Sequence, residues 1–589
     1  MTVPSGSSPS ERSLVDLQAS EGMGMAAIRI EERVGSAFGL GAAPSLRFES
    51  CQSIPGGGVL FLLPFLLECG LLSYRNHYEQ RSGYYTFDPL IITLAFLYLL
   101  RIKNPEQTKL HNPGELGKLV GYDRIPEVKK LRGMIKELTD KGKCSDWGKS
   151  LSKEWIEDEA PELYYIDGHV QVYHGYLANL GKKHVSRQRL CLPGMMEFWV
   201  NGQSGLPFFF ITARVNEKMI AMLEDEIIPA LLELHPVDDE LQQKMDSDPD
   251  YPRFTLVFDR EAYSPEFFKR LWDKHKIAAL TYRKNVKDTW DEALFEDETV
   301  ETRMGEVTMK LHEQALVTDQ CPMREIRKLS QDGHQTSIVT THRIWSIALI
   351  ACHMFGRWVQ ENFFRYMRQE YSFDRILQYA IDNIDSDITV VNREYSNITC
   401  KIKKKRETLA RRKAKLYDRE QHNQAGENEE IQEKETGKWL KKQLELSEQI
   451  KQIEVEIEKL TTQRKQIPYK IPLSKMPEDS RYNRLNQESK HFQNIIKMIC
   501  YRAETAFANS LAPHYKRSFD EIRTLVKAII NQTVDLFPDC QNNFLNITLY
   551  PLANQRSNRA VKNIIDTINL TNTIYQGTNL VMRFKIATI

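Results

Sequence analysis

Three acidic residues occupy positions where two short strands and a later helix are expected. Asp167 follows the apolar run Tyr164–Ile166, and Asp259 follows Leu256–Phe258. Glu361 lies in a later segment whose spacing predicts a helix. Two strand ends and one helix can deliver three carboxylates to a pair of hard divalent cations, with phosphate and water filling the remaining positions. The three acids therefore indicate a metal-dependent reaction at nucleic acid phosphates, either cutting or joining strands.

Glu361 is spaced regularly from two arginines. In a continuous helix, offsets of three, four and seven residues return to the same side. One face would therefore carry Met354, Arg357, Glu361 and Arg368. A ladder of surface salt bridges would explain this pattern without any function. In the functional interpretation, Glu361 faces a metal ion while the arginines bind phosphates. The forked guanidinium group suits that task.

Two more basic residues follow the predicted strand Ile277–Tyr282. Arg283 and Lys284 come directly after it, where they are expected to add phosphate contacts. Trp290 comes shortly afterwards. A core or turn position is the favoured interpretation of Trp290, and stacking on a flipped base is the alternative.

The composition excludes several classes of protein. The chain has 589 residues, of which 41% are hydrophobic and 27% charged, and its length predicts three or four folded domains. Lys and Arg number 80 against 79 Asp and Glu, so any basic surface must be local. Nine scattered cysteines form no C-x-x-C pair, which argues against zinc or a disulfide framework and favours a reducing cytoplasm. The longest apolar stretches fall short of the ~20 residues that span a membrane, so no membrane partner is expected.

The first 155 residues are expected to form a leader and a helical domain. Residues 1–45 are small and polar, which predicts a flexible lead-in. Residues 46–155 are expected to be helical, and Pro113–Val120 and Ile125–Ile135 flank Gly121 in the manner of a helix-turn-helix. Residues 101–150 carry 12 Lys/Arg against 7 Asp/Glu, which suits a DNA-binding domain, although such helix pairs also occur in ordinary bundles.

Residues 156–385 change to alternating strands and helices, so the predicted fold class is α/β. The expected order, β-β-β-α-β-α-β-α, is that of an RNase H-like mixed sheet. A β-rich insertion is expected at about 285–342, with a hairpin turn at Asp332-Gly333. A final helix, from about Ile344 to Arg368, is expected to pack on the sheet.

Apolar residues then recur every seven positions over 395–470, which predicts an antiparallel helical hairpin or coiled coil. Residues 401–415 contain nine Lys/Arg and one Glu. This run is typical of a solvated coiled-coil face, and contact with a DNA backbone is the alternative. Residues 475–589 are expected to be mainly helical.

The set of motifs resembles the DDE transposases of bacterial insertion sequences, in the branch with the signature Y-x2-R-x3-E-x6-K. The corresponding window here is Met354-x2-Arg357-x3-Glu361-x6-Arg368, with methionine for tyrosine and arginine for lysine; Tyr366 lies nearby. The resemblance covers roughly residues 160–375. The predicted helical domain that precedes them also looks like the N-terminal DNA-binding domain of such proteins.

The resemblance implies an RNase H-like catalytic domain in which Asp167, Asp259 and Glu361 are the catalytic residues and hold two Mg²⁺ ions, with Mn²⁺ able to substitute. It implies that the partner is double-stranded DNA, both the terminal inverted repeats of a mobile element and the target, bound by a homodimer in a synaptic complex. Location would be cytoplasmic, at the bacterial nucleoid. Arg357, Arg368, Arg283 and Lys284 would bind DNA. The alternatives are a metal-dependent nuclease without strand transfer and a catalytically silent DNA-binding protein.

Overall fold

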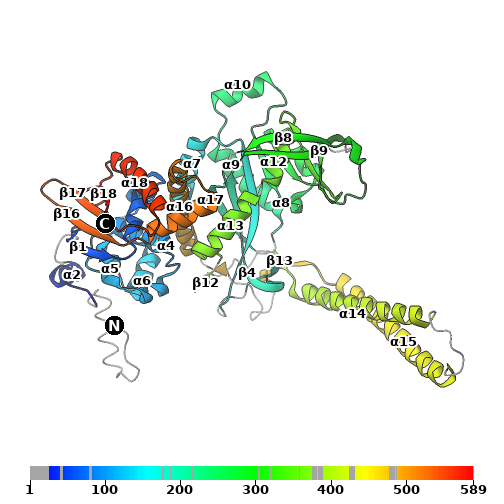
Figure 1. Ribbon diagram of the computed structural model, residues 1–589. Helices are drawn as coiled ribbons and strands as arrows, with labels where there is room; N and C mark the ends of the chain where they lie inside the picture. Colours follow the sequence, from blue (N-terminus) through cyan, green and yellow to red (C-terminus); the bar gives the residue numbers. More distant parts are fainter. Residues whose placement is uncertain are drawn as a thin grey trace, which may run out of the picture. The chain divides into compact units, whose positions relative to one another are not determined.

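The structure is a computed structural model (Figure 1). It describes residues 25–39, 44–78, 83–175, 178, 180–185, 188–214, 217–302, 305–317, 321–356, 358–374, 381–382, 389–423, 432–475, 484–485 and 487–587. The chain divides into two compact units. Unit 1 comprises Met1–His174, Gly181–Gln378 and Asn486–Ile589, and unit 2 comprises Gly175–Leu180 and Tyr379–Leu485.

Unit 1 is built on a ten-stranded mixed sheet with the order β3-β4-β2-β6-β7-β11-β10-β9-β8, and β5 pairs with β4. The α/β class is thus confirmed. β2 is antiparallel to β4 and parallel to β6, and β6 is parallel to β7. The strands are β2 (Leu163–Val172), β3 (Lys182–Val185), β4 (Leu190–Gly202), β5 (Pro207–Arg214), β6 (Phe254–Phe258), β7 (Ile277–Tyr282), β8 (Glu296–Thr302), β9 (Gly305–Val317), β10 (Pro322–Leu329) and β11 (Gln335–Thr340).

The central parallel strands are apolar on both faces. All five residues of β6 are buried. Short apolar runs of this kind are typical of parallel strands covered on both sides. Alternation along β2 separates the two faces, because Tyr164 and Ile166 enter one hydrophobic cluster while Leu163 and Tyr165 enter the other. The strand register therefore decides which face each later residue of β2 occupies.

The predicted insertion continues this same sheet. β11 pairs antiparallel with β7, and β10, β9 and β8 follow in order. The predicted turn at Asp332-Gly333 joins β10 to β11, and Gly333 has a φ of +78° that favours glycine. Helix α12 (Ile347–Phe355) packs on one face of this extension (Figure 1).

The predicted continuous helix Ile344–Arg368 is wrong in one respect. It is divided into α12, which ends at Phe355, and α13 (Trp358–Tyr371). At the junction, a Cβ on Gly356 would lie only 2.6 Å from the Cys352 carbonyl oxygen, so a side chain there would force the backbone apart. Met354 therefore belongs to α12, where it is fully buried, and does not extend the face of α13.

Helices cover the sheet and form much of the rest of unit 1. The helical stretch Met219–Leu234 contains a π-helical segment, Leu223–Ile227, between α8 and α9. Pro229, which has no N–H, stands at the start of α9. The helices are α2 (Ile30–Ala37), α3 (Leu63–Glu68), α4 (Phe87–Leu99), α5 (Pro113–Lys118), α6 (Val128–Thr139), α7 (Cys144–Glu159), α8 (Met219–Met222), α9 (Ile228–Leu234), α10 (Asp239–Ser247), α11 (Pro265–His275), α16 (Gln487–Leu511), α17 (Phe519–Ile530) and α18 (Gln555–Leu570).

The two ends of the chain share a second, four-stranded sheet. Its order is β1-β16-β17-β18, formed by β1 (Cys51–Ile54), β16 (Val534–Asp539), β17 (Phe544–Leu549) and β18 (Val581–Ile586). The C-terminal part of unit 1 therefore contains three strands that the expectation of a mainly helical segment did not include. The expected helix pair flanking Gly121 is present as α5 and α6. No helix among the described residues is long and apolar enough to cross a membrane.

Unit 2 contains two long antiparallel helices, α14 (Arg393–Asn423) and α15 (Gln432–Lys465). Ion pairing of Lys405 with Glu456 and hydrogen bonding of Arg412 with Gln449 fix the antiparallel direction. The predicted apolar repeat forms a buried seam that includes Ile398, Ile402, Leu446, Ile450 and Ile453. Two short sheets also belong to this unit, β12 (Ile381–Asp382) with β15 (Arg484–Leu485) and β13 (Thr389–Val391) with β14 (Lys470–Pro472).

Two buried histidines, His342 just before α12 and His353 within it, are expected to make stability depend on pH. His342 stacks on Trp345 at 4.0 Å between ring centroids, and His353 lies 4.8 Å from the same ring. Burial lowers the pKa of each histidine to about 4, and for His342 the nearby Arg324 acts in the same direction. The unfolded chain has histidine pKa values near 6.5 and thus binds more protons between about pH 6.5 and pH 4.

The contribution of these two histidines to the free energy of unfolding is therefore expected to be constant above about pH 6.5 and to fall by a few kcal/mol as the pH drops to about 4. Urea unfolding at pH 7.5, 6 and 5 measures this change. A His353→Leu variant should show a shallower fall over the same interval. An equally steep profile in the variant would contradict the assignment of this effect to His353.

Candidate active site

The sheet register brings the two aspartates side by side. The last paired residues of β2 and β6 are Ile166 and Phe258, so Asp167 and Asp259 come next on adjacent parallel strands. Adjacent strands lie about 4.8 Å apart. Asp259 continues in an extended conformation (φ −72°, ψ 157°) immediately after β6. Because side chains alternate, both aspartates lie on the sheet face that carries Tyr165.

Each aspartate is oriented by its own strand end. An Asp167 carboxylate oxygen accepts a hydrogen bond from the Gly168 N–H at 2.9 Å, and an Asp259 oxygen accepts one from the Arg260 N–H at 2.8 Å. Both aspartates are half-buried. A Cβ at Gly168 would lie 2.2 Å from the terminal methyl of Met196 and 3.1 Å from the Phe198 ring, so a larger residue there would require the Met196 side chain to move. Asp167 does not end its strand as expected, because β2 continues to Val172 along β4 after its pairing with β6 has ended.

Helix α13 is anchored over the same face by Gln360. The buried Gln360 amide donates to the Tyr165 carbonyl at 3.1 Å and the Trp199 carbonyl at 3.2 Å. It also lies 3.0 Å from Asn201 Oδ1. These bonds tie α13 to both β2 and β4 next to Asp167. Sequence reasoning missed Gln360, and its position beside Glu361 was the only signal that could have drawn attention to it.

The rotation of α13 sets the direction of Glu361. Phe363 contacts Trp199 on β4 at 5.3 Å between ring centroids, and Phe364 stacks on His169 of β2 at 5.2 Å. Since each residue advances about 100° around a helix, Glu361 lies about 60° beyond Phe364, on the flank away from β4. β6 is the neighbour of β2 on that side. Glu361 is exposed on this flank.

The described residues contain no group of three or more His, Cys, Asp or Glu side chains placed to hold a metal ion. The structure thus pairs Asp167 with Asp259 but does not bring Glu361 into one ligand group with them. Arg368, seven residues after Glu361, lies on the same flank of α13 and is half-buried. Arg357 lies outside the described residues.

Comparison with known proteins assigns the chain to a family. The sequence model of the Transposase_29 family, described as a transposase protein, matches residues 24–588. The chain belongs to this transposase family. No curated protein matches it closely enough to count as a relative. Transposases cut and move DNA, so the family implies an enzyme whose substrate is DNA.

In this transposase, Arg283 already has a protein partner. Its guanidinium pairs with Glu325, which also accepts hydrogen bonds from Arg327 and Ser337. Burial lowers the pKa of Arg283, but the hydrogen bond and charge of Glu325 outweigh it and raise that pKa. Arg283 therefore ties the end of β7 to β10 and β11. Lys284 donates to the Glu261 carbonyl at 3.1 Å.

Two aromatic residues singled out in the sequence, Trp290 and Tyr366, have partners inside the transposase. The Trp290 ring lies 4.0 Å from the Arg327 guanidinium, and Gln335 hydrogen-bonds both the N–H and the carbonyl of Trp290. These contacts favour the turn interpretation of Trp290. Tyr366 donates to the buried Glu504 at 2.5 Å, so it does not replace the tyrosine missing at Met354.

Proposed function

We propose that this transposase is of the DDE type, with Asp167, Asp259 and Glu361 as the ligands of two Mg²⁺ ions, for which Mn²⁺ can substitute. It would cleave DNA at the ends of a mobile element and transfer those ends to target DNA. The observation that carries the proposal is the register of β2 and β6, which puts Asp167 and Asp259 next to each other on one face. Two carboxylates so close together repel each other unless a cation lies between them.

The order of strands supports an RNase H-like core. Three strands come first along the chain, β2, β4 and β5, each antiparallel to the next. Two further strands, β6 and β7, are parallel to β2 and follow helices. This is the order expected for an RNase H-like sheet, if the short β3 and the helix α10 are regarded as additions. In such a sheet the carboxyl ends of parallel strands are the place for a site.

Each residue of the proposed site has a separate task. Bound Mg²⁺ would activate the attacking water or DNA 3′-hydroxyl and stabilise the leaving oxygen. The Gly168 and Arg260 N–H groups hold the two aspartates in position. Gln360 fixes the rotation of α13, which leaves the exposed Glu361 side chain on the flank that faces away from β4. Arg368, on the same flank, would position a DNA phosphate.

The proposed partners follow from the reaction. Both terminal inverted repeats and the target are double-stranded DNA, and cutting two ends together requires two sites. A homodimer in the synaptic complex is the simplest assembly that provides them. Arg283 and Lys284 could contact DNA only if their present bonds to Glu325 and the Glu261 carbonyl were exchanged for phosphates.

Replacing Glu361 with glutamine tests the proposal. The variant is expected to cleave a duplex carrying the terminal inverted repeat that borders the gene roughly 100-fold more slowly, because a neutral amide is a poor ligand for Mg²⁺. Single-turnover cleavage and joining of 3′ ends to a second duplex are measured together. Cleavage without any joined product in the unmodified protein would reassign it as a nuclease.

The matched control is Glu266→Gln. Glu266 is also an exposed glutamate in the first turn of a helix of unit 1, and its single ion pair with Arg270 is at the surface. This variant should cleave at the normal rate. Equal rates for the Glu361 variant and the control would refute the assignment of Glu361.

A further inference from the structure

We propose that α14 binds the phosphate backbone of double-stranded DNA through a row of basic side chains, here called the α14 stripe. The stripe consists of Lys401, Lys404, Lys405, Arg411, Arg412 and Lys415. The proposal rests on the proposed function only in that DNA is the substrate. The stripe lies wholly within unit 2 and shares no residue with the candidate active site.

Helical spacing places these six residues on one side of α14. Their offsets from Lys401 are three, four, ten, eleven and fourteen residues, which fall within about a third of the helix circumference. From Lys401 to Lys415 the stripe extends about 21 Å at 1.5 Å per residue. The buried seam residue Ile402 and the half-buried Leu409 lie next to this arc. The stripe therefore flanks the contact between α14 and α15.

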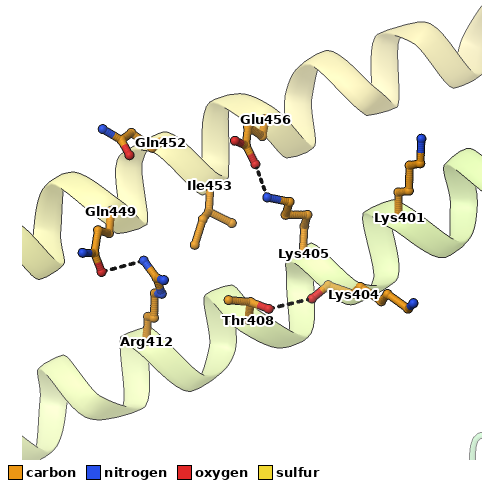
Figure 2. Close-up of a pocket in the computed structure, with 9 residues that line it drawn as sticks. All are labelled: Lys401, Lys404, Lys405, Thr408, Arg412, Gln449, Gln452, Ile453 and Glu456. Atoms are coloured by element: carbon orange, nitrogen blue, oxygen red, sulfur yellow. Dashed lines mark hydrogen bonds and ion pairs between the residues drawn. The ribbon is translucent and has the colours of Figure 1, made fainter.

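Four of the six stripe residues, Lys401, Lys404, Lys405 and Arg412, line a groove between the two helices (Figure 2). Its cationic lining comes from α14, and α15 contributes Gln449, Gln452, Ile453 and Glu456. Lys405 pairs with Glu456 at 2.5 Å and Arg412 donates to Gln449 at 2.6 Å. Among the described residues Lys401 and Lys404 have no ion pair. The groove thus presents positive charge that the facing helix leaves largely unopposed.

The charge balance of the two helices supports a ligand outside the hairpin. Residues 401–415 carry nine Lys/Arg and one Glu, whereas residues 441–465 of α15 carry six Lys/Arg and five Glu. Within the described residues, two ion pairs join residues 401–415 to α15, namely Lys405 with Glu456 and Lys413 with Glu454. An ordinary solvated face alternates charges, while an excess of one sign repels itself until a polyanion binds.

Duplex DNA matches this surface in charge density and length. It presents one negative charge for every ~1.7 Å of its axis, and one or two cations on each turn of α14 can contact several phosphates in succession. Lysine and arginine on flexible stems neutralise phosphates without reading bases. The stripe is therefore expected to bind without sequence preference, which suits target DNA rather than the defined ends of an element.

The test compares two triple variants of the full chain. The stripe variant carries Lys404→Gln, Arg411→Gln and Lys415→Gln. The control carries Lys403→Gln, Arg406→Gln and Lys451→Gln, which remove the same charge from exposed positions away from the groove. Affinity for a random-sequence duplex is measured from 50 to 300 mM salt without divalent metal, after circular dichroism has shown that both variants are folded.

The stripe variant is expected to reduce the slope of log affinity against log salt by roughly 3, about one for each phosphate that the variant no longer neutralises. The control should change it by less than about 1. An unchanged slope, or an equal change in both variants, would overturn the proposal. The same titration is made with single-stranded RNA, and a loss of affinity confined to that RNA would also overturn the proposal. Because no catalysis is measured, the result is independent of whether Asp167, Asp259 and Glu361 hold metal.

Discussion

Asp259→Asn is expected to lower the rate of DNA-end cleavage by at least about 1000-fold. Asparagine keeps the size of the side chain, and its amide oxygen can still accept the Arg260 N–H that orients Asp259. The substitution therefore removes charge and little else. Asp167→Asn should have an effect of the same size, since the register makes the two positions equivalent neighbours. Single-turnover cleavage in Mg²⁺ measures both.

A metal-dependent rescue separates loss of a ligand from loss of structure. Asp259→Cys should be inactive in Mg²⁺ and partly active in Mn²⁺, because Mn²⁺ accepts sulfur better than Mg²⁺ does. Asp273→Asn on α11, an exposed position that pairs with Lys269, is the control and should behave as the unmodified protein. Near-normal cleavage by Asp259→Asn would contradict the catalytic assignment of this residue.

Replacing Glu504 with alanine is expected to lower the free energy of unfolding by about 3–5 kcal/mol. Glu504 is fully buried on α16 and accepts hydrogen bonds from Arg101 at 2.7 Å, Tyr366 at 2.5 Å and Tyr371 at 2.6 Å. Burial alone would raise the pKa of Glu504, but the charges of Arg101 and Arg523 outweigh it and lower that pKa. Truncation would leave the buried Arg523 without its anion and the half-buried Arg101 with Glu370 as its remaining acidic partner.

Urea unfolding at pH 7.5 measures this loss, and Tyr366→Phe is the matched comparison. It removes one hydroxyl from the same cluster and should cost about 1 kcal/mol. A smaller effect for Glu504→Ala than for Tyr366→Phe would show that the buried charge is not the centre of the cluster. The result also concerns the active site, since Tyr366 and Tyr371 belong to α13 and thereby hold the helix that carries Glu361.

The sequence predicted the central strands well because their signal is local. Ile277–Tyr282 was predicted with the bounds that β7 has, since an apolar run ends there at charged residues. The placement of Asp167 and Asp259 after apolar runs was visible for the same reason. The sequence could not show that Asp167 and Asp259 are adjacent, because this depends on the parallel register of two strands that are about ninety residues apart.

Features that depend on tertiary pairing could not be predicted. The helical pattern continues through Gly356, so the break between α12 and α13 follows from packing and not from periodicity. β1 pairs with β16, as in the contact of Cys51 with Leu536, across most of the chain length. Arg283 can form its ion pair with Glu325 only because β11 and β10 fold back beside β7. The rotation of α13, and with it the direction of Glu361, is set by Gln360.

The chain leaves unit 1 after α13 and returns to it at α16, and the two points are held together. The Lys490 side chain on α16 donates to the carbonyl oxygen of Phe373, just beyond α13. The segment of more than a hundred residues between Phe373 and Lys490 is thus an insertion whose two ends lie next to each other in unit 1. Because the entropy of closing a loop grows only slowly with its length, helical turns can be gained or lost in pairs there at little thermodynamic cost. Among members of the family, the length of this hairpin should therefore drift during evolution more freely than any segment of the sheet.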